Sequence, residues 1–169
     1  MDENNGNDAT LLRKKIRNIL IVVIVGLLIS GVTAFPLETE IGWLDRQLQS
    51  LSGFSDLKRW IHTVHVGLHE TNVKYPFISY GSDWLAFAHI VIAIVFIGPL
   101  RDPVRNIWVI EFGIMASVLI FPLAFIAGPL RGIPVFWSLI DCCFGVICGA
   151  LLWYVRSKVR ELELASSGH

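Results

Sequence analysis

Three histidines in the middle of the chain are spaced as they would be along one side of a helix. His62, His65 and His69 are separated by three and four residues, which places them within about 60° of arc on a helix. Imidazoles are common ligands of divalent metals, and neighbours at this spacing can reach one ion. We therefore expect these histidines, with His89 as a further ligand, to hold a divalent metal. A solvated histidine face without a metal is the alternative.

Two ionisable residues, His89 and Asp141, lie inside strongly apolar segments. Trp84 and Trp137 mark the outer ends of these segments, and the helical rise puts His89 and Asp141 about 7.5 and 6 Å further in. Ionisable groups in a membrane usually face the protein interior. We predict that His89 and Asp141 contact each other and act as catalytic groups. The alternative is that each bonds only a backbone carbonyl or a serine.

Asp83 and Arg131 flank the same outer region and are the predicted ligand-binding residues. Together with the histidines they would form a polar pocket in the outer leaflet. Such a pocket suits a metal-activated water with a carboxylate as general base, while Arg131 binds an anionic lipid headgroup. Two histidines can instead ligate a b-type haem. Histidines that titrate near neutral pH can also act as a switch.

The chain contains four apolar segments that are long enough to span a membrane as helices, and these segments would position the residues above. They cover residues 18–35, 84–100, 107–127 and 133–155. Pro122 lies inside the third segment, where we expect it to kink the helix or end its regular part. The first segment follows basic residues and also suits a signal peptide. Its apolar run is long for a signal peptide, so we interpret it as a membrane anchor.

The positive charges predict how the spans are oriented, because cytoplasmic flanks hold the excess of Lys and Arg. Nine such residues fall on one side: Arg13, Lys14, Lys15, Arg17, Arg101, Arg105, Arg156, Lys158 and Arg160. We therefore predict a multi-pass protein of the cell membrane with both termini in the cytoplasm. Residues 1–15 are expected to be a disordered cytoplasmic tail. Residues 157–169 are expected to be a second tail, whose last residues suit an expression remnant.

Residues 37–83 join the first two spans on the outer side and are too few for a second domain. Their periodicity predicts an amphipathic helix over residues 55–71, with Ser55 as its N-cap. We expect this helix to lie on the outer surface or to cap the membrane domain. An earlier helical turn over residues 42–49 should direct Trp43, Leu44 and Leu48 inward.

The overall composition excludes several classes of protein. Hydrophobic residues make up 54% of the chain and charged residues 17%, whereas soluble domains carry about a quarter charged residues. The 14 basic and 14 acidic side chains cancel, which excludes a strongly basic nucleic-acid binder. High apolar content excludes general disorder, and three cysteines cannot form a disulfide framework. No phosphate-binding glycine loop or nucleophile elbow is present.

These observations predict an all-α integral membrane protein, with residues 16–156 forming a compact bundle of four transmembrane helices plus an amphipathic outer-surface helix. Its pocket is predicted to bind a divalent metal or a lipid-like ligand, and to act on it if the protein is an enzyme. The alternatives are a non-enzymatic membrane component, such as an assembly partner, a pH-responsive accessory or a transporter subunit, and a b-type haem protein.

Two further contacts are predicted inside the membrane domain. Gly145 and Gly149 form a Gly-x-x-x-Gly face, which indicates close helix packing, either toward the core of the bundle or against a second copy of the chain. Glu111, near the inner interface, is expected to form an ion pair with Arg101 or Arg105. Membrane lipids are the expected partners, and no nucleic acid is expected.

Overall fold

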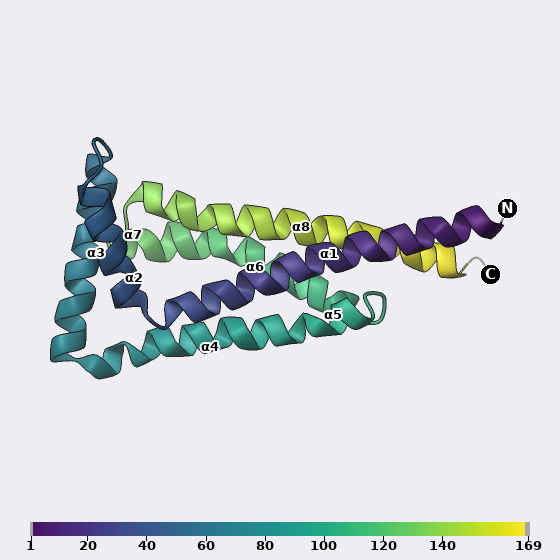
Figure 1. Cartoon of the computed structure of the whole chain (residues 1–169), viewed down its shortest axis with the longest axis horizontal. Helices are drawn as coiled ribbons and strands as arrows, with labels where there is room; N and C mark the ends of the chain where they lie inside the picture. Colours follow the sequence, from purple (N-terminus) through teal and green to yellow (C-terminus); the bar gives the residue numbers. More distant parts are fainter. Residues whose placement is uncertain (1, 168–169) are drawn as a thin grey trace. The chain divides into compact units, whose positions relative to one another are not determined.

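The computed structural model describes the backbone of residues 2–167 and the side chains of residues 10–164. Within these residues the chain is helical and contains no strand (Figure 1). In chain order the elements are α1 (Asp2–Ala34), α2 (Leu37–Gln49), α3 (Ser55–Lys74), η1 (Pro76–Ile78), α4 (Tyr80–Val95), α5 (Ile97–Arg101), α6 (Ile107–Pro122), η2 (Leu123–Ala127), α7 (Gly128–Leu130) and α8 (Val135–Ser167).

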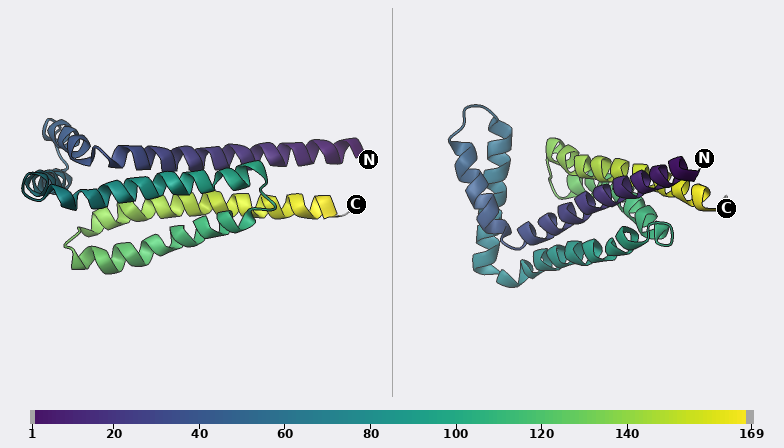
Figure 2. Two further views of the ribbon diagram at one scale, coloured as in Figure 1. Left: turned by 90° about the horizontal axis from the view of Figure 1, so that it is seen from below. Right: turned by 45° about the vertical axis from the view of Figure 1, so that its right-hand side comes forward.

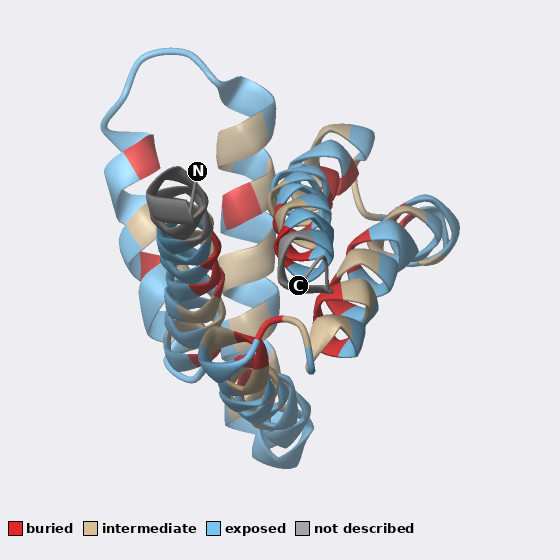
Figure 3. Cartoon of the chain, turned by 90° about the vertical axis from the view of Figure 1, so that its right-hand side faces the viewer, coloured by how far each residue is buried: buried red, intermediate tan, exposed pale blue. Residues whose placement is uncertain are grey.

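Four helical stretches are long and apolar enough to cross a membrane, as the sequence predicts. They are Thr10–Ala34, Pro76–Arg101, Ile107–Leu130 and Val135–Leu164. Only 22 to 28% of the most apolar part of each stretch is buried within the protein. Most of each helix is exposed or intermediate in Figure 3. So extensive an apolar surface suits contact with lipid rather than water. Membrane insertion, the kind of membrane and the cytoplasmic termini stay predictions.

The chain divides into two compact units, which we describe separately. The first contains Met1–Val25 and Ala93–His169, and the second contains Gly26–Ile92. The predicted packing of all four spans into one compact bundle therefore stays a prediction.

In the first unit, α6 and α8 run antiparallel and pack side by side (Figure 2). Ile110 of α6 and Leu152 of α8 are fully buried. A Cβ added to Gly145 would lie 2.8 Å from the carbonyl oxygen of Ser117, and one on Gly149 would lie 3.3 Å from the Ser117 Cβ. The Gly-x-x-x-Gly face therefore packs against α6 of the same chain, which is the first of the two contacts expected for it. A homo-oligomer stays a prediction, without this face to support it.

The regular part of the third span ends at Pro122, as predicted. α6 stops there, and η2 continues as a π-helical turn over Leu123–Ala127. Proline lacks the N–H that a helix interior requires, and its ring displaces the carbonyl one turn back. Wider π-helical turns are frequent at functional sites. η2 lines the pocket described below.

Both terminal helices extend further than the sequence analysis predicts. α1 begins at Asp2 and α8 reaches Ser167, so most of residues 1–15 and 157–169 is helical, and their place in the cytoplasm stays a prediction. Ile16 and Leu20 are buried one turn apart in α1. Val159 and Leu162 are likewise buried on one side of α8. Buried residues thus recur at helical spacing beyond the purely apolar stretches, and their packing stabilises the longer helices. Residues 1 and 168–169 lie outside the described residues.

In the second unit, α2 and α3 form an antiparallel hairpin that runs across the ends of α1 and α4 (Figure 1). The final part of α1 approaches α4 closely, because a Cβ added to Gly31 would lie 2.8 Å from the Ala86 carbonyl oxygen. Short linkers join the hairpin to α1 and to α4. The hairpin therefore stands at one end of two candidate spans, the end predicted to lie on the outer side.

Two details of the hairpin differ from the sequence prediction. The residue that precedes α3 is Phe54, in a left-handed conformation with φ of 57°, and Ser55 is already helical without capping it. Trp43 is 59% exposed rather than directed inward, whereas Leu48 is buried as predicted. The reason is that Asp45 occupies the side of α2 that faces α3, and Trp43 projects from the opposite side.

Candidate functional site

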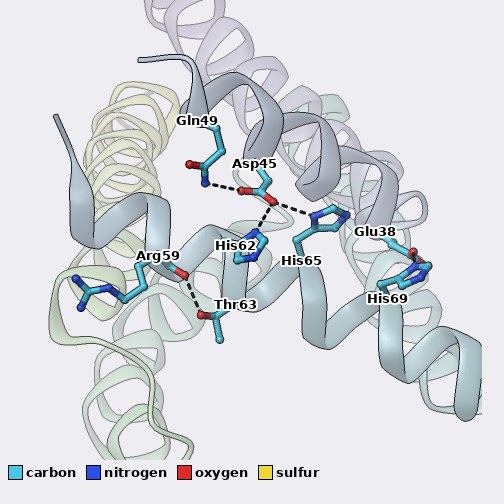
Figure 4. Close-up of polar contacts among 8 residues, drawn as sticks. All are labelled: Glu38, Asp45, Gln49, Arg59, His62, Thr63, His65 and His69. Carbon is cyan, nitrogen blue, oxygen red and sulfur yellow. Dashed lines mark hydrogen bonds and ion pairs between the residues drawn. The ribbon is translucent and has the colours of Figure 1, made fainter. Parts of the chain in front are cut away.

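The centre of the hairpin is a buried carboxylate held by two histidines of the neighbouring helix (Figure 4). Nδ1 of His62 lies 2.9 Å from Oδ2 of Asp45, and Nδ1 of His65 lies 3.0 Å from the same oxygen. Gln49 donates its side-chain N–H to the other oxygen at 3.1 Å. An ionised carboxylate can only accept, so both imidazoles carry a proton on Nδ1. Asp45 is thus fully satisfied although only 8% of its side chain is exposed.

These contacts favour the ionised form of Asp45. The hydrogen bond from His62 is the largest cause, and with those from Gln49 and His65 it outweighs the effect of burial. Together they lower the pKa of Asp45 from 3.8 to about 2. Hydrogen bonds donated to a carboxylate stabilise its charge, whereas burial opposes it. Asp45 therefore keeps its negative charge throughout the physiological range.

A second carboxylate, Glu38, binds the other end of the histidine stripe. Nδ1 of His69 lies 2.8 Å from Oε1 of Glu38, and the side-chain amide of Asn72 donates to Oε2. Ser79, just before α4, in turn donates its hydroxyl to the Asn72 oxygen. The bonds from Asn72 and His69 lower the pKa of Glu38. This chain of contacts links α2 through α3 to the start of α4.

Sequence reasoning found the three histidines but missed their partners Glu38 and Asp45. The sequence does contain a pattern that could have identified these partners: the two carboxylates are seven residues apart and therefore share one face of a helix. Gly42 stands between them on the same face. A carboxylate stripe that matches a histidine stripe in length predicts paired helices. That match becomes visible only when residues 37–49 are treated as one helix.

The hairpin histidines are hydrogen-bonded to carboxylates, and the metal centre expected from their spacing stays a prediction. Among the described residues, no group of three or more His, Cys, Asp and Glu side chains is placed to hold a metal ion. The reason is that each imidazole turns Nδ1 toward a carboxylate at hydrogen-bonding distance. His62 and His65 also project from one side of a single helix, so they cannot bind a haem iron from opposite faces. Metal and haem binding at this stripe therefore have no support from the geometry.

His89 and Asp83 lie in α4, within the second unit. The His89 Nδ1–H donates to the Leu85 carbonyl one turn earlier, at 2.8 Å. This is the backbone contact considered as the alternative for His89. Asp83 is half-buried in the first turn of α4, where the helix dipole favours a negative charge. Asp141 belongs to the other unit, so its contact with His89 stays a prediction.

Asp141 and Arg131 come together in the first unit, where both line a pocket of about 270 Å³. Ser138 lines it too, and the remaining wall is formed by Ile120, Leu123, Ala124, Ala127, Gly128 and Ile133. Among the described residues, the side chains of Asp141 and Arg131 have no hydrogen-bond or ion-pair partner. An ionisable group left unpaired in an apolar span is costly and usually functional. The sequence had selected both residues, and the structure places them at one pocket.

Glu111 pairs with a residue that the sequence analysis did not consider. Nε of Arg156 lies 2.7 Å from Oε1 of Glu111, so the ion pair joins α6 to α8 rather than to the short 101–106 linker. The guanidinium of Arg156 also lies 5.7 Å from the ring centroid of Trp153. The predicted ion pair exists, but the expected partners Arg101 and Arg105 were wrong.

The comparisons with known proteins identify no relative. Neither a protein-family model, nor a curated protein, nor a solved structure matches this chain. The functional argument therefore depends on the two polar sites alone.

Proposed function

We propose that this chain is a membrane protein that binds a lipid-like amphiphile in the Asp141 pocket. One observation carries the proposal: Asp141 lines a mostly apolar pocket and has no partner among the described side chains. A carboxylate in such a place suits a ligand that brings its own positive charge or hydrogen-bond donor. Its apolar neighbours suit an alkyl chain.

The charges around the pocket narrow the class of ligand. Asp141 is negative and Arg131 is positive, and both line the same cavity. Arginine binds phosphate oxygens well because its planar guanidinium offers several donors. A headgroup that combines a phosphate with a primary amine matches both charges, as in phosphatidylethanolamine. The volume of about 270 Å³ lies near the lower end for ligand pockets. It therefore suits a headgroup and the start of a chain, with the rest of the lipid outside.

The test uses the purified full chain in detergent and a fluorescent short-chain phosphatidylethanolamine as the probe. We expect it to bind more tightly than the matching phosphatidylcholine, whose quaternary amine donates no hydrogen bond. Asp141→Asn should lower the ratio of the phosphatidylethanolamine affinity to the phosphatidylcholine affinity by about tenfold, since hydrogen bonds to charged groups contribute about 1.5–3 kcal/mol. Arg131→Gln should weaken the binding of both lipids.

Cys143→Ser provides the matched control, because Cys143 is exposed, lies on the same helix and does not line the pocket. It should leave both affinities unchanged. Equal affinity for the two lipids in the wild-type chain would contradict the proposal. So would an Asp141→Asn variant that keeps the preference while its circular dichroism matches the wild type.

A further inference from the structure

One end of the first unit carries a concentration of permanent positive charge. Three segments contribute to it: the early part of α1, the turn that follows α5 and the last part of α8. Figures 1 and 2 show these segments at the end of the unit where the two chain termini lie. We refer to their nine cations as the basic end: Arg13, Lys14, Lys15, Arg17, Arg101, Arg105, Arg156, Lys158 and Arg160. The described carboxylates beside them are Asp102, Glu111, Glu161 and Glu163, which leaves a net charge of +5.

Most cations of the basic end have no counter-ion within the described part of the protein. Arg156 binds Glu111, and Lys158 binds Glu161. The other seven form no ion pair with a described carboxylate, and all seven are exposed. The acidic residues that precede Thr10 come about one to three turns earlier on α1, farther from the span. The basic end is therefore free to attract an anion from outside the chain.

The four cations of α1 surround the helix rather than form a single stripe. At about 100° per residue, Arg13, Lys14, Lys15 and Arg17 point in widely different directions, and Ile16 between them is buried. They also lie within about 6 Å of one another along the helix axis. A helix that crosses a bilayer therefore presents these charges as a partial ring at one depth.

Aromatic side chains indicate what lies at that depth. Trp108, in the first turn of α6, and Trp153 of α8 are 60% and 62% exposed. Exposed tryptophans of membrane proteins favour the level of the lipid headgroups. Arg156 and Arg160 follow Trp153 by about one and two turns of α8, and the Arg156 guanidinium lies 5.7 Å from the Trp153 ring centroid. The basic end therefore lies at the headgroup level, provided that the candidate spans insert.

We propose that the basic end is a docking surface for the anionic headgroups of phospholipids in the surrounding bilayer. Each lysine or arginine near an anionic membrane surface strengthens the attraction by about fivefold. Arginine also binds phosphate oxygens through several N–H donors at once. The proposal rests on the membrane location given under the proposed function. It does not rest on the Asp141 pocket, because that pocket shares no residue with the basic end.

The experiment uses the full chain reconstituted in phosphatidylcholine vesicles with a trace of spin-labelled lipid. Electron spin resonance separates lipid that the protein immobilises from free lipid. At low salt we expect the chain to retain labelled phosphatidylglycerol about fivefold more strongly than labelled phosphatidylcholine. In about 1 M salt the difference should disappear, because charges are then screened beyond about 3 Å. Both labels enter both leaflets, so the direction in which the chain inserts does not affect the result.

Two triple variants remove charge from different elements of the basic end. The first, on α1, combines Lys14→Gln, Lys15→Gln and Arg17→Gln. The second combines Arg101→Gln, Arg105→Gln and Arg160→Gln. Each should lower the preference for phosphatidylglycerol by about twofold or more. All six side chains are exposed and outside the ion pairs of the described residues, and if one triple variant does not fold, the other still decides.

The matched control removes the same charge from the α2–α3 hairpin, through Arg46→Gln, Arg59→Gln and Lys74→Gln. It should leave the lipid preference unchanged. Equal retention of the two labels by the wild-type chain overturns the proposal and would indicate that the cations serve a soluble acidic partner. An equal loss of preference in the control also overturns it, because overall charge would then be the cause. The absence of any immobilised lipid would overturn the membrane location as well.

Discussion

Gly42 of α2 lies directly against the imidazole of His65 on α3. A Cβ added to Gly42 would stand 2.8 Å from Nε2 of His65, closer than side chains can approach without moving. The ring of His65 cannot swing away without losing its bond to Asp45. The glycine is therefore what allows the buried carboxylate to receive two histidines from the neighbouring helix.

Gly42→Ala is expected to loosen the hairpin although alanine is the better helix former. The displaced ring should cost about 1–3 kcal/mol, which exceeds the gain of about 1 kcal/mol in helix propensity. Hydrogen exchange of residues 37–74 measures the effect. Gly67→Ala on α3 is the control, because nothing lies within 4 Å of its added Cβ, and it should stabilise the hairpin slightly. A Gly42→Ala variant as protected as Gly67→Ala would contradict the role of this contact.

The hairpin should open in strong acid and not near neutrality. The pKa of Asp45 is lowered from 3.8 to about 2, so its contribution to stability is complete above the unfolded value and is lost as the pH falls through about 2. Asp45→Asn should remove this acid transition and weaken the hairpin by about 1–3 kcal/mol at neutral pH. Exchange rates of residues 37–74 between about pH 7 and 2 test this. Wild-type opening between pH 7 and 5 would argue against it.

Gly145→Ala is expected to disturb the packing of α8 against α6. The new Cβ would meet the Ser117 carbonyl oxygen at 2.8 Å, and a backbone atom cannot rotate away as a side chain can. We expect a loss of about 1–3 kcal/mol, seen as a lower thermal midpoint of the detergent-solubilised protein. Gly26→Ala in α1 meets nothing within 4 Å and serves as the control. Equal thermal midpoints for the two variants would show that α6 and α8 are less closely packed.

The Glu111–Arg156 ion pair should contribute modestly to the stability of the folded protein. Its side chains are 41% and 23% exposed, and exposed pairs of this kind contribute about 0.2–1 kcal/mol. A double-mutant cycle with Glu111→Gln and Arg156→Gln isolates that coupling from the other contacts of Arg156. The same cycle with Arg105→Gln in place of Arg156→Gln should give no coupling. A larger coupling to Arg105 would restore the partner first expected from the sequence.

Local composition was enough to predict the helices but not the partners of their side chains. A run of apolar residues is enough to indicate a long apolar helix, and a proline ends a regular helix by its own chemistry, so the four candidate spans and the break at Pro122 were predictable. The spacing of His62, His65 and His69 likewise places them on one face of α3. None of these features needs a second segment of the chain.

Tertiary structure decided which segment each of these groups meets. Asp45 binds His62 and His65, and Arg156 rather than Arg105 binds Glu111. The glycines of α8 face α6 of the same chain, one of the two contacts that the sequence left open. Each of these outcomes depends on which helices pack together and in what register. Such packing joins residues far apart in the sequence, and the periodicity of one segment cannot determine it.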